Sequence, residues 1–247
     1  MMGGKELINS TNTSLKTNKN DVILSILKGL LGIVPYAGSA LGEIIAWSIP
    51  NQRIDRACAY LEQLASQISK ISDIQNSWIE KLKSSRSNLL LFELATKYSI
   101  ETNSNILHHC YAYFIFNAIE NKTLEDSRNE KLLQTLSELK EEEIIHLIKF
   151  SQYKVLGFLS EFDDKYEKII MPKSQTDHIT ENDIHNAFRD QYILTLELKG
   201  LITIIMKNNG TKLPISDKDV HITDYGRLLV EAIYDEEFFE RINYGGQ

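Results

Sequence analysis

The sequence is poor in residues that interrupt or cross-link a chain. Its 247 residues include 12 Gly, 4 Pro and 2 Cys. So few helix-breaking residues favour long helices. Cys58 and Cys110 belong to no Cys-x-x-Cys pair, which argues against a disulfide framework and favours a reducing compartment.

The sequence also lacks the motifs of common enzyme classes. It contains no GxxxxGK[ST], no GxGxxG after a strand and no GxSxG. His108 and His109 are adjacent, so on a helix they point about 100° apart and are poorly placed to share a metal. His178 and His185 have no cysteine partners, and a zinc site needs three or four converging ligands. We therefore expect no catalytic residues, no metal site and no cofactor, and not an enzyme.

An excess of positive charge is missing as well. The net charge is −7, while 43% hydrophobic and 25% charged residues are ordinary for a folded protein. Proteins that wrap nucleic acid need clustered Lys and Arg to neutralise phosphates. The charge balance argues against such wrapping and leaves room for a small basic patch.

What the sequence does have is one long apolar run, residues 22–50 (VILSILKGLLGIVPYAGSALGEIIAWSIP). Lys28 and Glu43 are its only charged residues. Such a run must be hidden from water in a core, against partner chains or in lipid. Before it, residues 1–20 are polar and are expected to form a flexible arm on a chain that starts in the cytoplasm.

Pro35 divides the apolar run, because the residue before a proline is pushed out of helical geometry. We expect one helix over 21–33 and another over 35–47. Each would be about 20 Å long, which is shorter than the roughly 30 Å hydrocarbon layer of a bilayer. Together they could span the layer, and as a hairpin they could insert part way.

Small residues recur every fourth position of the second helix, at Gly38, Gly42 and Ala46. This spacing lets helices approach closely, both in membranes and in soluble cores. The residues therefore leave a membrane segment and a buried core hairpin open. The residues of the membrane interpretation are Lys28, Gly29, Gly32, Pro35, Gly38, Gly42, Glu43 and Ala46.

A heptad seam follows the apolar run. Apolar residues alternate steps of three and four between 54 and 82, which predicts one helix over 52–83, roughly 50 Å long. The partner is either a helix of the same chain or a second subunit, and Gln75 would set the register of an intersubunit coiled coil. The seam residues of the oligomer are Leu61, Leu64, Ile68, Ile71, Gln75 and Trp78.

The rest of the chain predicts further helices and a small sheet. Helices are expected over 87–98 and 103–120, the second as the central core helix. From about 130 a short helix, a longer helix and a helix that ends at Gly200 precede two strands joined by a turn. Thr223 caps the last helix, over 224–242.

These elements predict a mainly α protein. A helical N-terminal region with a kinked apolar segment and a long amphipathic helix precedes a small C-terminal winged-helix-like α+β module. The expected domains are a polar arm, a membrane-active segment, a helical oligomerisation and core region, and the module, over 1–20, 21–50, 51–125 and 126–247.

The winged-helix pattern raises nucleic acid as a ligand, because basic and aromatic groups together hold phosphates and stack bases. Acidic residues interleave with these groups, whereas a major-groove reader would show a more one-sided helix. Packing, oligomerisation or a short nucleotide ligand is therefore favoured over sequence-specific duplex binding. The candidate contacts are Arg189, Tyr192, Lys199, Lys207, Lys212 and Arg227.

Two stretches resemble a known group of proteins. GLLGIVPYAGSALGEIIAWSIPNQRIDRACAYLEQLASQI, over 29–68, resembles a motif of bacterial antiphage and abortive-infection proteins. There, a glycine-rich apolar segment with a central proline runs into an amphipathic helix with an arginine near its start, here Arg53 and Arg56. The C-terminal ITDYGRLLVEAI resembles the Abi-alpha type, and the order of parts is similar to the membrane effector of the Hailong defence system.

The resemblance implies a non-enzymatic effector that is cytoplasmic and associated with the bacterial inner membrane. Its homo-oligomers, implied to be tetramers, would form or gate a pore or ion channel in the lipid. A nucleotide or single-stranded DNA oligomer, made by a partner nucleotidyltransferase, would bind the soluble part and hold the channel shut. The alternative is a cytoplasmic winged-helix DNA-binding regulator that dimerises through the seam.

Overall fold

The computed structural model describes most of the chain from residue 51 onward. The described residues are 51–70, 75–121, 126–152, 162, 165–170, 181–205, 215 and 219–241. They form a mainly helical structure with a small two-stranded antiparallel sheet near the C-terminus, which confirms the predicted fold class. The chain divides into two compact units, Met1–Leu133 and Gln134–Gln247.

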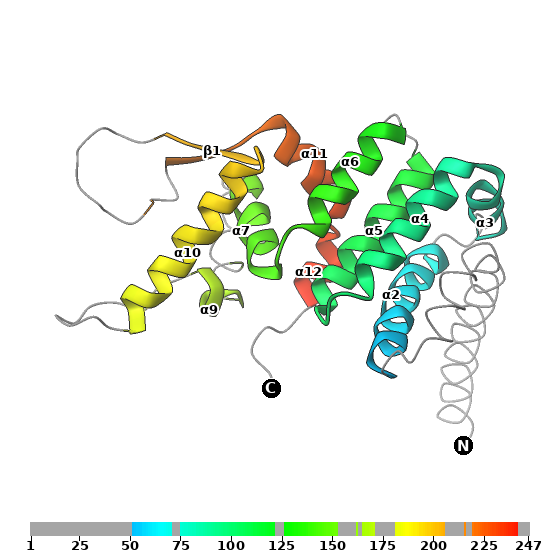
Figure 1. The fold of residues 1–247 in the computed structure, drawn as a ribbon, viewed down its shortest axis with the longest axis horizontal. Helices are drawn as coiled ribbons and strands as arrows, with labels where there is room; N and C mark the ends of the chain where they lie inside the picture. The colour runs from blue at the N-terminus through cyan, green and yellow to red at the C-terminus, as the bar shows by residue number, and fades with distance from the viewer. Residues whose placement is uncertain are drawn as a thin grey trace, which may run out of the picture. The chain divides into compact units, whose positions relative to one another are not determined.

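Among the described residues, the first unit is built around α5 (Asn105–Asn121), which contacts three other helices. They are α2 (Asn51–Ser69), α3 (Gln75–Ser84) and α4 (Arg86–Ser99). In Figure 1, α2, α4 and α5 lie side by side. α5 is buried on several sides, as expected for a central core helix; its fully or nearly buried residues include Ile106, Cys110, Tyr111, Phe114, Ile115 and Ile119. α6 (Asp126–Ser137) follows and crosses the division between the units.

The single helix predicted over 52–83 is wrong. α2 ends at Ser69, Lys70 forms a turn, and α3 begins at Gln75. Both helices keep the predicted apolar face, and α2 uses that face against α5, α4 and α3. A seam that looks continuous in sequence is therefore divided between two helices.

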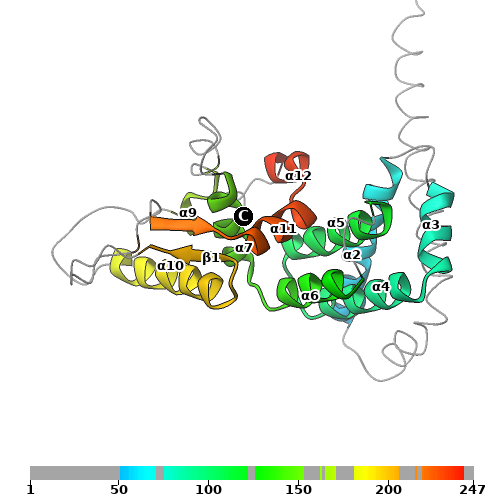
Figure 2. The same ribbon diagram turned by 90° about the horizontal axis from the view of Figure 1, so that it is seen from above.

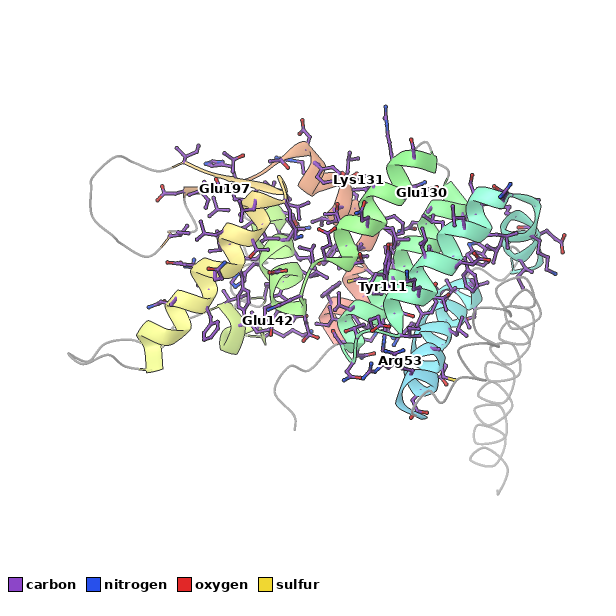
Figure 3. All side chains as sticks on the ribbon, viewed as in Figure 1. Arg53, Tyr111, Glu130, Lys131, Glu142 and Glu197 are labelled. Carbon is purple, nitrogen blue, oxygen red and sulfur yellow. The ribbon has the colours of Figure 1, made fainter. Side chains whose placement is uncertain are left out.

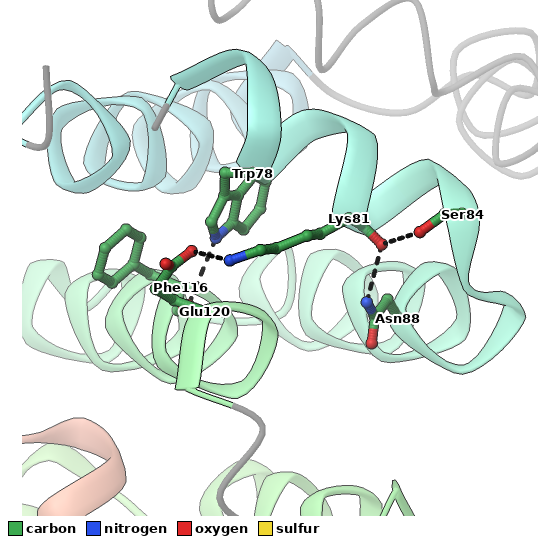
Figure 4. A network of polar contacts seen from close by, with 6 residues as sticks. All are labelled: Trp78, Lys81, Ser84, Asn88, Phe116 and Glu120. Atoms are coloured by element: carbon green, nitrogen blue, oxygen red, sulfur yellow. Dashed lines mark hydrogen bonds and ion pairs between the residues drawn. The ribbon is translucent and has the colours of Figure 1, made fainter. Parts of the chain in front are cut away.

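Polar contacts hold α3 against its neighbours (Figure 4). Trp78 Nε1 donates to the carbonyl oxygen of Phe116 at 3.4 Å, and Lys81 Nζ lies 2.9 Å from Glu120 Oε2. The Asn88 side-chain amide donates to the Lys81 carbonyl oxygen at 2.9 Å. α3 is thus tied to the last turns of α5 and to the start of α4.

The second unit combines helices with the sheet. Its helices are α7 (Glu141–Gln152), α9 (Glu167–Ile170), α10 (Glu181–Leu198), α11 (Asp224–Ile233) and α12 (Glu236–Arg241). β1 (Ile202–Ile204) pairs antiparallel with β2 (Val220–Ile222), with Thr203 opposite His221. α7 contacts α10, α11 and β2, so it lies at the centre of this unit. Figure 2 shows the strands running beside α10.

Gly200 turns the chain from α10 into β1, as predicted. Its φ of +70° lies in the left-handed region, which favours glycine. Its N–H donates to the Glu197 carbonyl oxygen, and the N–H of Leu201 donates to that of Leu196, which together form a Schellman motif.

Thr223 caps α11, also as predicted, because its side chain accepts from the N–H of Gly226. Its own N–H and hydroxyl both donate to the Leu201 carbonyl oxygen at 3.0 Å. At Gly226, a Cβ would lie 2.1 Å from the same oxygen. The absence of a side chain at this position therefore lets α11 begin directly against the turn between α10 and β1.

The single last helix predicted over 224–242 is wrong. α11 ends at Ile233, and Tyr234 adopts an extended backbone. α12 begins at Glu236, and the Asp235 carbonyl oxygen accepts from the N–H groups of Phe238 and Phe239. The break separates two helices in the last part of the second unit.

Candidate functional site

Arg189 was expected at a ligand, but the structure uses it inside the second unit. The residue is 7% exposed, and its Nη1 donates to the Ile215 carbonyl oxygen at 2.8 Å. The neighbouring Asp190 accepts from the N–H of Ile215 at 3.3 Å, and burial raises the pKa of that carboxyl. Both backbone groups of Ile215 are thus held by two consecutive side chains of α10.

Lys199 and Tyr192 also have partners in the second unit. Lys199 Nζ lies 2.7 Å from Glu138 Oε2. The Tyr192 ring lies 6.1 Å from the His146 ring, centroid to centroid, and burial is the main cause that raises the pKa of its hydroxyl. Glu142, on α7, adds to this shift through its negative charge (Figure 3).

The remaining ligand candidates divide into two kinds. Arg227 on α11 is exposed, whereas Lys207 and Lys212 lie outside the described residues. The acidic Glu197, near the C-terminal end of α10, is not a candidate; it accepts from the N–H of Ile204 at 2.9 Å and so holds the end of β1 (Figure 3). Among the described candidates, therefore, Arg227 is the cation that the structure leaves exposed on the module.

The predicted oligomer seam is buried within the first unit. Leu61, Leu64, Ile68 and Trp78 are at most 4% exposed. Ile71 lies outside the described residues, and Gln75 is the first residue of α3. The described seam residues therefore have their partners within the chain, and an intersubunit coiled coil through them would require α2 to leave α5.

The proposed membrane segment lies outside the described residues, together with its eight named positions from Lys28 to Ala46. In the part of the chain from α2 to α12 that the structure describes, no helix combines the length and the apolar character needed to cross a bilayer. Nor do the described residues contain a group of three or more His, Cys, Asp or Glu side chains placed to hold a metal.

A pocket of about 340 Å³ lies in the first unit, where sequence reasoning expected no site. α2 contributes Asp55, Arg56 and Ala59, while α5 and the residues before it contribute Asn103, Asn105 and His108. Arg56 and His108 lie 52 positions apart in the sequence, so no local pattern brings them together.

Two pocket residues serve the C-terminal end of α4. Arg56 Nη1 donates to the Ile100 carbonyl oxygen at 3.0 Å. His108 Nε2 lies 3.0 Å from the Ser99 carbonyl oxygen and 3.2 Å from that of Thr102. Both side chains thus satisfy carbonyl groups that the end of a helix leaves without helical partners.

Arg53, one turn before Arg56, extends the contact between α2 and this region (Figure 3). Its Nη2 lies 3.7 Å from Glu101 Oε1, and both side chains are partly exposed to solvent. Further along α2, the Gln63 amide donates to Asn105 Oδ1 at 3.3 Å. Polar contacts along α2 therefore fix this helix beside the pocket.

Comparisons of this chain with family models, with curated proteins and with solved structures find no match.

Proposed function

We propose that this protein is an oligomeric antiphage effector whose segment 22–50 forms or gates a pore in the bacterial inner membrane. A nucleotide or DNA oligomer on the soluble part would control it. The apolar run carries the proposal, because from Gly29 to Ile49 it holds a single charged residue, Glu43. In a symmetric oligomer Glu43 would form a ring of carboxylates, which favours cations.

The start of α2 supports this proposal. α2 begins at Asn51, the residue that follows the apolar run in the sequence. A displacement of α2 would therefore move the residue to which the run is joined in the sequence. Because the described seam is buried, the proposed oligomer uses other surfaces or forms once α2 separates from α5.

The proposal is tested by toxicity on overexpression in bacteria. Gly42→Leu removes a small residue from the close-packing face, and Glu43→Lys reverses the charge of the ring. Both variants should abolish growth arrest and membrane depolarisation while circular dichroism shows an unchanged helical fold. Leu41→Ile, which conserves volume, is the matched control and should remain toxic. Full toxicity of both variants at equal expression would refute the pore.

The arrangement of α10, β1, β2 and α11 favours a second candidate, a cytoplasmic winged-helix regulator that binds duplex DNA. Its expected signature is salt-dependent binding of a DNA duplex. Arg189→Ala would test folding rather than contact, because Arg189 is buried. Arg227→Ala is the better probe, and unchanged binding by that variant would argue against a contact through α11.

A further inference from the structure

His108 leaves one ring nitrogen for a ligand. The residue is 3% exposed, and both groups near its Nε2 are carbonyl oxygens, so Nε2 must carry the proton and donate. Burial lowers the pKa of the imidazole, which keeps the ring neutral near pH 7. A neutral ring protonated at Nε2 has an acceptor at Nδ1, and among the described residues Nδ1 has no hydrogen-bond partner.

The pocket supplies donors as well. Arg56 uses Nη1 for the Ile100 carbonyl oxygen and its Nε is buried, so Nη2 is the nitrogen left for another acceptor. Asn105 accepts from Gln63 through Oδ1, which leaves its two amide N–H groups free to donate. The lining residues therefore offer one neutral acceptor and several donors, and Asp55 adds a carboxylate to the same lining.

The charge and size of the pocket restrict the ligand. One arginine and one aspartate nearly cancel, so the pocket offers no strong attraction for phosphate groups, and the part of a ligand that enters it is uncharged. Its volume of about 340 Å³ lies near the lower end of the range of small-molecule sites, about 300–1,000 Å³. The matching ligand is small and carries a hydrogen-bond donor next to an acceptor oxygen.

We propose that this pocket binds a nucleobase through an imide edge, in which a ring N–H donates to His108 Nδ1 and an adjacent carbonyl oxygen accepts from Arg56. Thymine and uracil have this imide edge, and guanine presents the same N–H beside a carbonyl oxygen as a lactam. Reading a base by hydrogen bonds along its pairing edge is a common mode of recognition. The inference rests on the proposed function in that it names the ligand of the control step. It places that ligand beside the first half of α2 rather than on α10.

Binding of thymidine to the full chain in detergent, measured by equilibrium dialysis, tests the site. We expect a Kd of about 1 mM or tighter for a ligand of this size. N3-methylthymidine lacks the ring N–H and should bind about tenfold more weakly or worse, because His108 Nδ1 would lose its donor. Equal binding of both compounds, or no binding of thymidine, uridine or guanosine, would overturn the proposal.

Variants separate the pocket from other surfaces. Ala59→Leu fills the pocket on a helix that tolerates leucine, and His108→Gln removes the ring; each should weaken thymidine binding about tenfold or more. His221→Gln, at an exposed histidine on β2, is the matched control and should bind as the unaltered chain does. Unchanged binding by folded Ala59→Leu would overturn the site even if His108→Gln does not fold.

The toxicity assay is independent of this measurement. If thymidine binds as expected but Gly42→Leu and Glu43→Lys stay toxic, the pore proposal fails and the pocket stands. If toxicity is lost as expected and thymidine does not bind, only the pocket proposal fails.

Discussion

Arg189 donates from Nη1 to the backbone carbonyl oxygen of Ile215 at 2.8 Å, across 26 positions of sequence. Asp190 accepts from the N–H of the same residue. This pair of contacts fixes a residue of the β1–β2 connection to the middle of α10. It also removes from the surface an arginine that would otherwise read as a ligand contact.

The Arg189 contact predicts a loss of stability on substitution. Arg189→Ala leaves the Ile215 carbonyl oxygen without its charged donor, and such hydrogen bonds contribute about 1.5–3 kcal/mol. The free energy of unfolding, from urea denaturation, should fall by about that amount. Arg227→Ala, at an exposed arginine of the same unit, should leave the midpoint unchanged. Equal midpoints for both variants would contradict the inferred role of Arg189.

Two glycines of the second unit should respond differently to alanine. At Gly200 an added Cβ meets nothing within 4 Å, so the loss comes from the left-handed backbone alone, about 1–2 kcal/mol. Asn tolerates this conformation better, so Gly200→Asn should lose less. Gly226→Ala should lose most, because its Cβ would meet the Leu201 carbonyl oxygen. Thermal unfolding of the three variants gives the order, and a smaller loss for Gly226→Ala than for Gly200→Ala would contradict it.

His108 predicts a loss of stability in acid. Burial is the main cause that lowers its pKa from 6.5, the Arg56 charge adds to it, and the bonds to Ser99 and Thr102 oppose it. Since the folded-state pKa is the lower one, the unfolded chain binds the proton more tightly. The contribution of the neutral ring to the free energy of unfolding is therefore fully present above pH 6.5, and it is lost as pH falls through the folded-state pKa.

The measurement is the free energy of unfolding between about pH 7.5 and about pH 5. The decline should be shallower for His108→Gln than for the unaltered chain. His221→Gln, at an exposed position, should keep the full decline. Identical slopes for all three proteins would show that His108 does not titrate as inferred.

The buried seam makes a prediction about assembly. Leu64 is fully buried within the first unit, so Leu64→Ala should lower the free energy of unfolding by about 2–5 kcal/mol. The loss should be the same at low and high protein concentration, because the partner is α5 of the same chain. Glu62→Ala, at an exposed residue of α2, is the control. A loss that grows on dilution would place Leu64 at a subunit interface instead.

Local chemistry was enough to predict several elements. Gly200 and Thr223 mark the end of α10 and the start of α11 because a left-handed glycine and a threonine cap act within a few residues. The expected helices over 87–98 and 103–120 fall within a few residues of α4 and α5. Each of these signals lies within the element that it predicts.

The division of the predicted helix 52–83 into α2 and α3 could not be predicted from periodicity, because the apolar residues keep the same spacing of three and four across both helices. The contacts that fix α3 separately, Trp78 to Phe116 and Lys81 to Glu120, join residues 38 and 39 positions apart. The break before α12 had a visible signal, since Asp235 followed by Glu236 and Glu237 is typical of a helix start.

The candidate sites were harder to predict than the fold. An arginine such as Arg189 usually lies on the surface, so the sequence favours a ligand contact. Its partner in the structure is a backbone carbonyl oxygen, which no pattern of side chains predicts. The pocket depends on Arg56 and His108 meeting at the end of α4, which follows from the packing of α2 on α5. The position of Arg189 and the formation of the pocket both depend on tertiary contacts, which the periodicity of the sequence does not show.

The close approach of Gly226 to the Leu201 carbonyl oxygen gives a means of recognising distant relatives. Any homologue that starts α11 against the carbonyl group at position 201 needs a glycine there, three residues after the capping threonine. A Thr-x-x-Gly pattern that follows a helix, a left-handed glycine and two short strands would therefore persist where the rest of the sequence has diverged. Searching for that spacing is a way to trace the lineage of this chain.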